Sequence, residues 1–263
     1  MATYSVTSLT KLRMGAPWRM QELHGNQSHH LYWITRGQGR VIISCINRGY
    51  GPNTAIWVPA RTIMALELPA QIQGLVLEVP TTEDLGLPER AVHLRISNIE
   101  AQGNLTSAIE RIERELAGQA PAMARALQAY GLLISTALTR ELERQDGALG
   151  SKASHGLVRK FSDLMEGSYH QGFGVADFAK ELGVTPTHLS RVCRETAGRP
   201  AHALLNERVM HAARAMLSDT RLSARAVSEQ LGFSSPAYFT RAFAGYTGLT
   251  PTEFRRAGPR RIG

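Results

Sequence analysis

The sequence predicts an α+β protein, in which a β-rich first part precedes a second part made only of helices. Short β-branched and aromatic runs separated by glycine and proline fill residues 27–80, whereas apolar residues recur with helical spacing after residue 101. Residues 175–198 and 224–248 then repeat one helix-turn-helix pattern. Because one domain takes about 150 residues, the 263 residues predict roughly two domains.

Four runs in the first part are predicted to be strands. They are residues 31–34, 40–44, 55–58 and 75–79, and the turn residues between and after them include Gly37, Gly39, Asn47, Gly49, Pro59 and Pro80. Short strands at such close spacing are typical of a small β-barrel or sandwich. The aromatic residues Tyr32, Trp33 and Trp57 lie in these runs, where they either pack in the core or line a ligand pocket; use in the core is favoured.

Two amphipathic helices are predicted within residues 101–147. Their apolar stripes are Leu105, Ile109, Ile112 and Leu116, then, after a break at Pro121, Leu127, Tyr130, Ile134, Ala137 and Leu138. These faces have to be buried against the β unit, against the same helices of a second chain, or against both. The glycine- and serine-rich stretch that follows predicts a linker at residues 148–154, between domains of residues 1–147 and 155–263.

The net positive charge lies almost entirely in the second part of the chain. Residues 1–150 hold 14 basic and 13 acidic residues, whereas residues 151–263 hold 16 and 9. This imbalance predicts that the second part meets a polyanion, either nucleic acid or an anionic membrane. Two cysteines exclude a disulfide framework and a multi-cysteine zinc site. No secretory signal or membrane span is visible, so the expected location is the cytoplasm.

Each copy of the repeat contains the parts of a helix-turn-helix unit, at about residues 175–196 and 224–247. A first helix ends at glycine, serine or threonine then caps a second helix, and proline occupies its first position. These residues are Gly183, Thr185 and Pro186 in the first copy, and Gly232, Ser235 and Pro236 in the second. Residues 200–217 predict a helix of roughly 27 Å that spaces the two units about one DNA turn apart.

The second helix of each unit is expected to present one face to DNA. This face carries Thr187, Ser190, Arg191 and Arg194 in the first copy, and Ala237, Thr240, Arg241 and Ala244 in the second. Such a helix enters the major groove, where arginine donates two hydrogen bonds to guanine. Alanine offers no hydrogen bond, so the first copy is expected to carry most direct base readout. His188 and Tyr238 are expected to pack partly buried, and Arg208 to form an internal ion pair.

Residues 155–258 resemble the DNA-binding domain of AraC/XylS-type bacterial transcription regulators. The most specific matches are residues 231–243, 248–251 and 253–255, while Cys193 and Thr247 replace usual phenylalanines. The resemblance implies a cupin-like N-terminal barrel that binds a small-molecule effector and forms a homodimer. It also implies a sequence-specific activator that binds double-stranded promoter DNA and contacts RNA polymerase, without a cofactor. The C-terminal Arg255, Arg256, Arg260 and Arg261 either touch phosphate or form a solvated tail.

A metal-dependent cupin enzyme with a DNA-binding appendage is the alternative. Metal-dependent cupins resemble one another in a His-x-His pair and a later histidine. Here His24, His29 and His30 lack that spacing, and Arg61 and Met64 stand near the later position. Such a histidine cluster is expected in a solvated loop, so no metal ligand and no catalytic residue is predicted. A non-specific architectural DNA binder is disfavoured because the net charge of the second part is modest.

Overall fold

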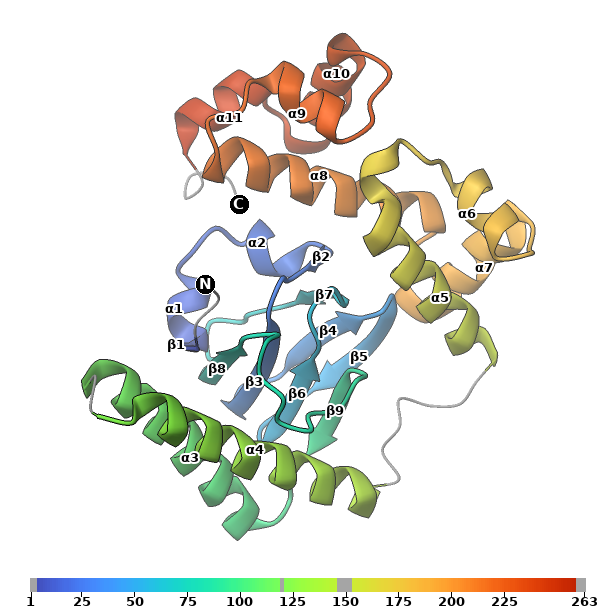
Figure 1. Cartoon of the computed structure of the whole chain (residues 1–263). Coiled ribbons are helices and arrows are strands. Elements are labelled where there is room, and N and C mark those ends of the chain that lie inside the picture. Colours follow the sequence, from blue (N-terminus) through green and yellow to red (C-terminus); the bar gives the residue numbers. More distant parts are fainter. Residues whose placement is uncertain (1–3, 119–120, 146–152, 259–263) are drawn as a thin grey trace.

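A computed structural model of the chain describes residues 4–118, 121–145 and 153–258 (Figure 1). Two antiparallel sheets are covered by two long helices on one side and by a group of shorter helices on the other. The predicted fold class, N-terminal antiparallel strands followed by helices, is therefore confirmed. None of the described helices is both long and apolar enough to cross a membrane.

The first sheet has five strands, and both of its faces are buried. Its order is β1 (Ser5–Ser8), β8 (Gln73–Val79), β3 (His29–Arg36), β6 (Thr54–Val58) and β9 (Val92–Arg95). Neighbouring side chains alternate between faces, so Trp33 packs toward the long helices and Tyr32 toward the second sheet. This double burial explains why residues 55–58 are apolar without alternation.

The second sheet has four strands, in the order β2 (His24–Gly25), β7 (Ile63–Leu66), β4 (Gly39–Ile43) and β5 (Ile46–Tyr50). Two expectations are corrected here. Residues 46–50 form a strand where a turn was predicted, because Ile46 and Tyr50 are buried while the residues between them pair with β4. His29 and His30 lie on β3 and His24 on β2, rather than in a solvated loop.

The two long helices are α3 (Ile99–Gly118) and α4 (Met123–Gln145), as the periodicity predicts. Their stripes bury Leu105, Ile109, Ile112, Leu127, Ile134 and Leu138 in one core with the five-stranded sheet. The first of the two burial alternatives, packing on the β unit, is thus present. Leu132 and Leu133 of α4 stay exposed.

The remaining helices lie near the N-terminus and in the C-terminal part. Two short helices, α1 (Leu9–Arg13) and α2 (Trp18–Gln21), come before β2. After the strands and long helices follow α5 (Ala153–Ser168), η1 (Tyr169–Gln171), α6 (Val175–Glu181), α7 (Pro186–Ala197), α8 (Ala201–Asp219), α9 (Ala224–Gln230), α10 (Pro236–Thr247) and α11 (Pro251–Ala257). Most of the predicted linker, residues 148–152, lies outside the described residues.

Candidate nucleic-acid interface

The first helix-turn-helix unit consists of α6 and α7. Gly183 takes a φ of 68° after α6, where a side chain is rarely tolerated. Thr185 Oγ1 then accepts a hydrogen bond of 3.2 Å from the backbone N–H of His188, and Pro186 begins α7. The cap satisfies one of the free amides at the helix start and fixes its direction.

The second unit, α9 and α10, has the same turn chemistry. Gly232 takes a φ of 70°, and Ser235 Oγ accepts a 3.2 Å hydrogen bond from the N–H of Tyr238. Gly198 and Gly248 end α7 and α10 in the left-handed region, at φ of 74° and 75°. The two sequence repeats therefore have the same turn conformation and the same helix cap.

The predicted reading residues lie on the outward sides of α7 and α10. Thr187, Arg191, Arg194, Ala237 and Arg241 are exposed, and Ser190, Thr240 and Ala244 are half-buried. Leu189 and Phe239, on the opposite sides of the same helices, are fully buried. Each helix is anchored by its apolar side, which leaves its polar side available to a ligand.

The arginines of α7 differ in their contacts. Arg191 Nη1 donates to Glu195 Oε1 at 2.6 Å, and its Nη2 lies 3.2 Å from His188 Nδ1. Arg194 forms no ion pair with any carboxylate that the structure describes. Arg194 is therefore the arginine of α7 whose donors are not already engaged along its own helix.

The structure also tests what the sequence predicts for the neighbours of the reading residues. His188 and Tyr238 are exposed rather than partly buried, and the Tyr238 ring lies 5.9 Å from that of Phe233. Thr240 Oγ1 donates to the carbonyl of Pro236 at 2.9 Å, so only its acceptor capacity remains. Arg208 pairs internally with Glu166 at 2.6 Å, as predicted.

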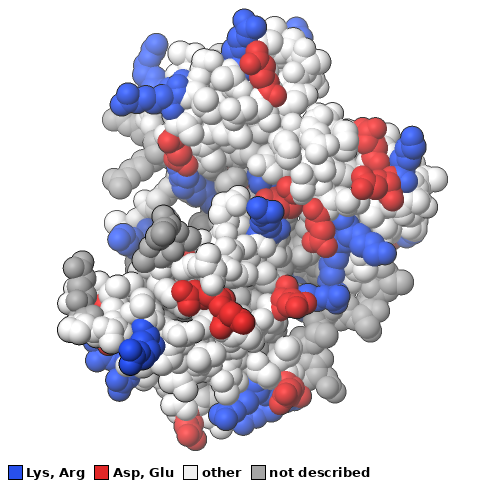
Figure 2. Space-filling view, in the orientation of Figure 1, with Lys and Arg blue, Asp and Glu red and all other residues white. Residues whose placement is uncertain are grey.

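The C-terminal arginines differ in their contacts. Arg255 Nε donates to the carbonyl of Leu217 at 3.1 Å, and its Nη2 bonds to the carbonyl of Leu222. It therefore caps the end of α8, and its role is structural. Arg256 is exposed, while residues 260 and 261 lie outside the described part. Figure 2 shows basic side chains over the upper part of the molecule, where α9 to α11 lie in Figure 1.

Helix α8 carries both units. Its Leu204, Leu205 and Val209 pack with the first unit, and its Met210, Ala213 and Leu217 pack with the second. A second contact lies between Gly172, just before α6, and Gly232 in the turn of the second unit, and their backbones are so close that neither residue has room for a side chain. Spacing between the units is thus fixed at two places.

Gly172→Ala is expected to lower the free energy of unfolding by about 1–3 kcal/mol, because Gly172 has a φ of 75° and its Cβ would lie 2.4 Å from the carbonyl oxygen of Gly232. Urea unfolding measures the change. The matched control is Gly103→Ala on α3, where a new Cβ meets nothing within 4 Å. That variant is expected to be neutral or more stable by about 0.5–1 kcal/mol. Equal losses for both variants would contradict the contact.

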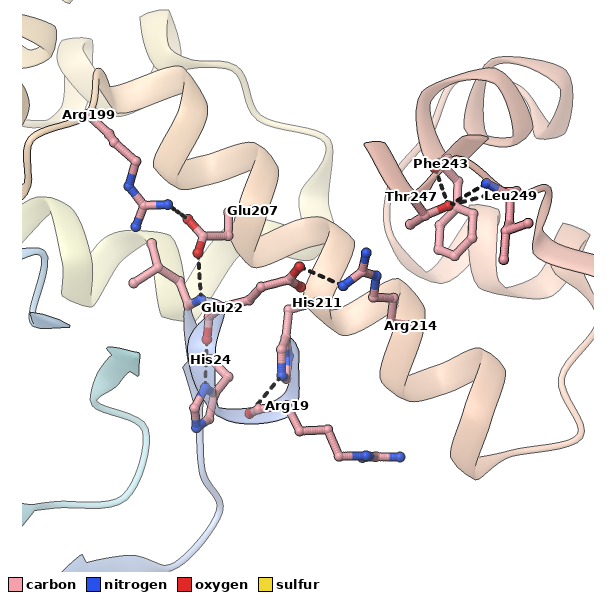
Figure 3. Close-up of polar contacts among 11 residues, drawn as sticks. Arg19, Glu22, His24, Arg199, Glu207, His211, Arg214, Phe243, Thr247 and Leu249 are labelled. Atoms are coloured by element: carbon pink, nitrogen blue, oxygen red, sulfur yellow. Dashed lines mark hydrogen bonds and ion pairs between the residues drawn. The ribbon is translucent and has the colours of Figure 1, made fainter. Parts of the chain in front are cut away.

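The β domain holds α8 through charged residues that sequence reasoning did not identify (Figure 3). Arg214 of α8 donates to Glu22 at 2.6 Å, and the buried Glu207 accepts a 3.2 Å hydrogen bond from the N–H of Leu23. Arg199 forms an ion pair with the same Glu207 carboxylate. The sequence contains no signal for them, because at helical spacing Glu207 and Arg214 fall on the side opposite the apolar stripe that includes Val209.

The interior of the β domain does not hold an open pocket at the predicted aromatic residues. Tyr32, Trp33 and Trp57 are each 1% exposed. The Trp33 Nε1–H donates to Thr106 Oγ1 at 2.9 Å, and the Trp57 Nε1–H donates to the carbonyl of Pro88 at 2.8 Å. The core role is confirmed for all three. Within the described ranges, no three His, Cys, Asp or Glu side chains are grouped as metal ligands.

A cavity of about 1050 Å³ lies instead between the β domain, the end of α4 and α5. Its walls combine apolar and charged side chains. They include Pro88, Ala91, Val92 and Leu142, together with Glu89, Arg90, Glu143, Arg159, Lys160 and Asp163.

Comparison with known proteins gives this geometry its context. Residues 178–257 match the family of helix-turn-helix domains. The virulence regulon transcriptional activator VirF of Yersinia enterocolitica is 25% identical over 210 residues, which are 78% of this chain and 73% of that protein. The arabinose operon regulatory protein of Escherichia coli is 27% identical over 123 residues, 47% of this chain and 42% of that protein.

Solved structures with a similar course of the chain include ToxT from Vibrio cholerae and the C-terminal domain of AraT from Geobacillus stearothermophilus. ToxT is 14% identical with a TM-score of 0.45, over 97% of this chain and 96% of that one. The AraT domain is 26% identical with a TM-score of 0.38, over 40% of this chain and 88% of that one. By its duplicated helix-turn-helix domain and these relatives, the chain is similar to AraC-type transcription regulators.

Proposed function

We propose that the protein is a sequence-specific activator that places α7 and α10 in two successive major-groove segments of promoter DNA. The observation that carries this proposal is the pair of equivalent helix-turn-helix units on one connecting helix. At 19 residues, α8 is about 28 Å long, close to the roughly 34 Å between equivalent points one DNA turn apart. The proposal divides the chain into an effector domain of residues 1–147 and a DNA-binding domain of residues 155–263.

The reading residues then have distinct roles. Arg194 donates to guanine in the first groove segment, with Thr187 and Ser190 beside it. Arg191, held by Glu195, is oriented toward the backbone phosphates or a base edge. In the second segment Arg241 is the donor, and Ala237 offers only a methyl group for contact with thymine.

Selection of bound sequences from a random duplex library at physiological salt tests this proposal. The wild type is expected to recover two sequence blocks about one turn apart. Arg194→Ala is expected to weaken binding to the recovered site by about 1–3 kcal/mol and to relax the first block, and Arg241→Ala to relax the second block with a smaller loss.

Arg140→Ala is the matched control, because Arg140 is an exposed arginine of α4 on the far side of the sheets. It is expected to leave both blocks intact. A wild-type protein that recovers no block, with or without cell extract, would contradict sequence-specific binding. Two arginine variants that behave like the control would contradict the assigned reading helices.

We also propose a homodimer that contacts RNA polymerase at the promoter. The exposed Leu132 and Leu133, at 47% and 60%, lie next to each other on α4 and support a second-chain contact there. Sedimentation of wild type and Leu133→Ser compares their association. A dimer that survives unchanged in Leu133→Ser would place the interface elsewhere.

We infer that the effector site is the cavity beside α4 and α5. Ligand sites favour domain interfaces and commonly have volumes of about 300–1,000 Å³, and the combination of apolar walls with a few charged groups suits a small organic molecule. A ligand bound there touches both the β domain and α5, so it has different affinities for different arrangements of the two.

A thermal-shift screen with small metabolites tests the effector site. Compounds that raise the melting temperature of the wild type are expected to lose this effect in Leu142→Trp, whose larger side chain fills the cavity. Ile99→Trp, at the exposed start of α3 and outside the cavity lining, is expected to respond like the wild type. Compounds that stabilise all three proteins equally would show that they bind outside the cavity.

A further inference from the structure

Two histidine rings meet where the β domain touches α8. His24 of β2 is 4% exposed, and its ring stacks on that of His211 of α8, with centroids 5.0 Å apart and planes inclined by 20°. The Trp18 indole of α2 lies edge-on against the same His211 ring at 5.2 Å. Figure 3 shows His211 extending from α8 toward the segment that carries Arg19, Glu22 and His24.

The hydrogen bonds of both rings suit neutral imidazoles. His24 Nδ1 lies 2.8 Å from the carbonyl oxygen of Glu22, and His211 Nε2 lies 3.4 Å from the carbonyl oxygen of Arg19. Each of these nitrogens is therefore the donor. In the described part of the chain, neither ring bonds to a carboxylate that would compensate a second proton.

The charged groups around the rings leave no partner for an imidazolium. Arg19, Arg208 and His30 face the rings with positive or potentially positive charge. The nearby carboxylates are engaged already: Glu22 with Arg214, Glu166 with Arg208, Glu207 with Arg199 and the Leu23 N–H, and Asp219 with Arg19. A proton added to either ring thus creates a buried, uncompensated cation, which is costly.

The same contact controls the position of both helix-turn-helix units. Trp18 is buried in the core of the second unit, where its ring lies 6.2 Å from that of Phe254. The first unit shares a core with Ile46, Ile63 and Ala65 of the four-stranded sheet. Separation of residues 18–25 from α8 therefore removes the restraint that the β domain places on the second unit.

We propose that this junction is a proton-operated lock, in which protonation of His24 and His211 separates residues 18–25 from α8 and frees the second helix-turn-helix unit from the β domain. The lock goes beyond the proposed promoter binding and needs neither an effector nor DNA.

The pKa values of the two histidines show in which direction pH shifts the equilibrium between the closed and open junction. Burial lowers the pKa of His24 from 6.5 to about 4 and that of His211 from 6.5 to about 2. In an open junction both groups regain the ordinary value, so the open form binds more protons. Below pH 6.5 each histidine favours opening by up to tenfold per pH unit, until the pH reaches its closed-form pKa.

Glu22 opposes this effect over part of the range. Burial raises the pKa of Glu22 from 4.5 to about 7, although Arg214 lowers it. A carboxyl with a raised pKa favours the closed form as the pH falls from 7 toward 4.5. Burial also raises the pKa of Glu207, which accepts from the Leu23 N–H in this junction, so Glu207 favours the closed form as well. Opening is therefore expected only below about pH 6, where the protons gained by the two histidines outweigh those lost by the carboxyls, because the pKa of His211 is lowered furthest. Tyr246, which also faces Glu22, has its pKa raised by burial and stays protonated throughout.

The fluorescence of Trp18 reports opening directly. The full-length protein is titrated from pH 8 to pH 5 without DNA, and Trp18→Phe is measured in parallel to isolate the signal of Trp18 from those of Trp33 and Trp57. A red shift of Trp18 emission below pH 6 is expected, with far-ultraviolet circular dichroism unchanged and an increased radius of gyration in small-angle scattering. No shift down to pH 5 would overturn the lock.

Neutral variants provide the decisive comparison. His24→Asn keeps a donor at the position of Nδ1, and His211→Gln keeps one at the position of Nε2, but neither side chain takes up a proton. The double variant is expected to show no transition, and each single variant to open at a lower pH than the wild type. His188→Gln, an exposed histidine of α7, is the control and is expected to open like the wild type. A double variant that is folded at pH 8 and opens like the wild type would overturn the proposal. If the double variant does not fold, single variants with unchanged midpoints would overturn it.

Discussion

Arg214→Ala is expected to lower the free energy of unfolding by about 3–5 kcal/mol at pH 8, because it leaves the Glu22 carboxylate buried without its cation. The guanidinium also lies 5.6 Å from the Trp18 ring and 5.4 Å from the Tyr246 ring, so its removal also takes packing from the second helix-turn-helix unit. Chemical denaturation measures the loss.

The loss is expected to depend on pH with a definite sign. Burial already raises the pKa of Glu22 to about 7, and removal of the neighbouring arginine raises it further. Below that pH the carboxyl becomes neutral, and the penalty for burying its charge disappears. The variant is therefore expected to be most destabilised above pH 7 and to approach the wild type as the pH falls toward 5.

Arg225→Ala is the control for this variant, because Arg225 forms an exposed ion pair with Glu229 one helical turn away on α9. It is expected to cause no measurable change. Glu22→Leu combined with Arg214→Met removes both charges and is expected to recover most of the stability. If Arg214→Ala is as stable as Arg225→Ala, or its loss does not depend on pH, the buried pair does not hold the domains together.

The local features of this chain were predictable because their causes lie within a few residues. Thr185 and Ser235 were recognised as helix caps from the proline that follows each, and α3 and α4 from apolar residues at helical spacing. Strand β5 was missed because Asn47 and Gly49 have low strand propensity, and only pairing with β4 overrides it.

The junction was not predictable for a different reason. Glu22 and Arg214 are 192 positions apart, and nothing in either neighbourhood names the other as its partner. Alternation marks Tyr32 and Trp33 as members of opposite faces but does not show that both faces are covered. Glu207 and Arg214 also fall on the polar side of the helix that the sequence predicts, and only the fold shows that this side of α8 is covered as well.

Phe239→Ala is expected to cost about 3–5 kcal/mol, because a fully buried ring is removed from the centre of the second unit. Its neighbours Phe233 and Phe243 lie 5.1 and 5.7 Å away between ring centroids, and Phe254 extends the cluster to α11. Because α10 is anchored through this ring, the variant is expected to lose the second DNA block even where the rest of the chain stays folded. Chemical denaturation and library selection on the same preparation measure the two effects.

Leu189→Ala is the matched change in the first unit, since Leu189 takes the equivalent buried position on α7. It is expected to cost about 2–5 kcal/mol and to lose the first block instead of the second. The comparison separates the effect on stability from the effect on DNA recognition, because the two variants should lose similar stability but different sequence blocks. If either variant loses both blocks together while circular dichroism shows a folded chain, the units read DNA as one rigid body. In that case the contact between Gly172 and Gly232, rather than α8 alone, transmits the damage from one unit to the other.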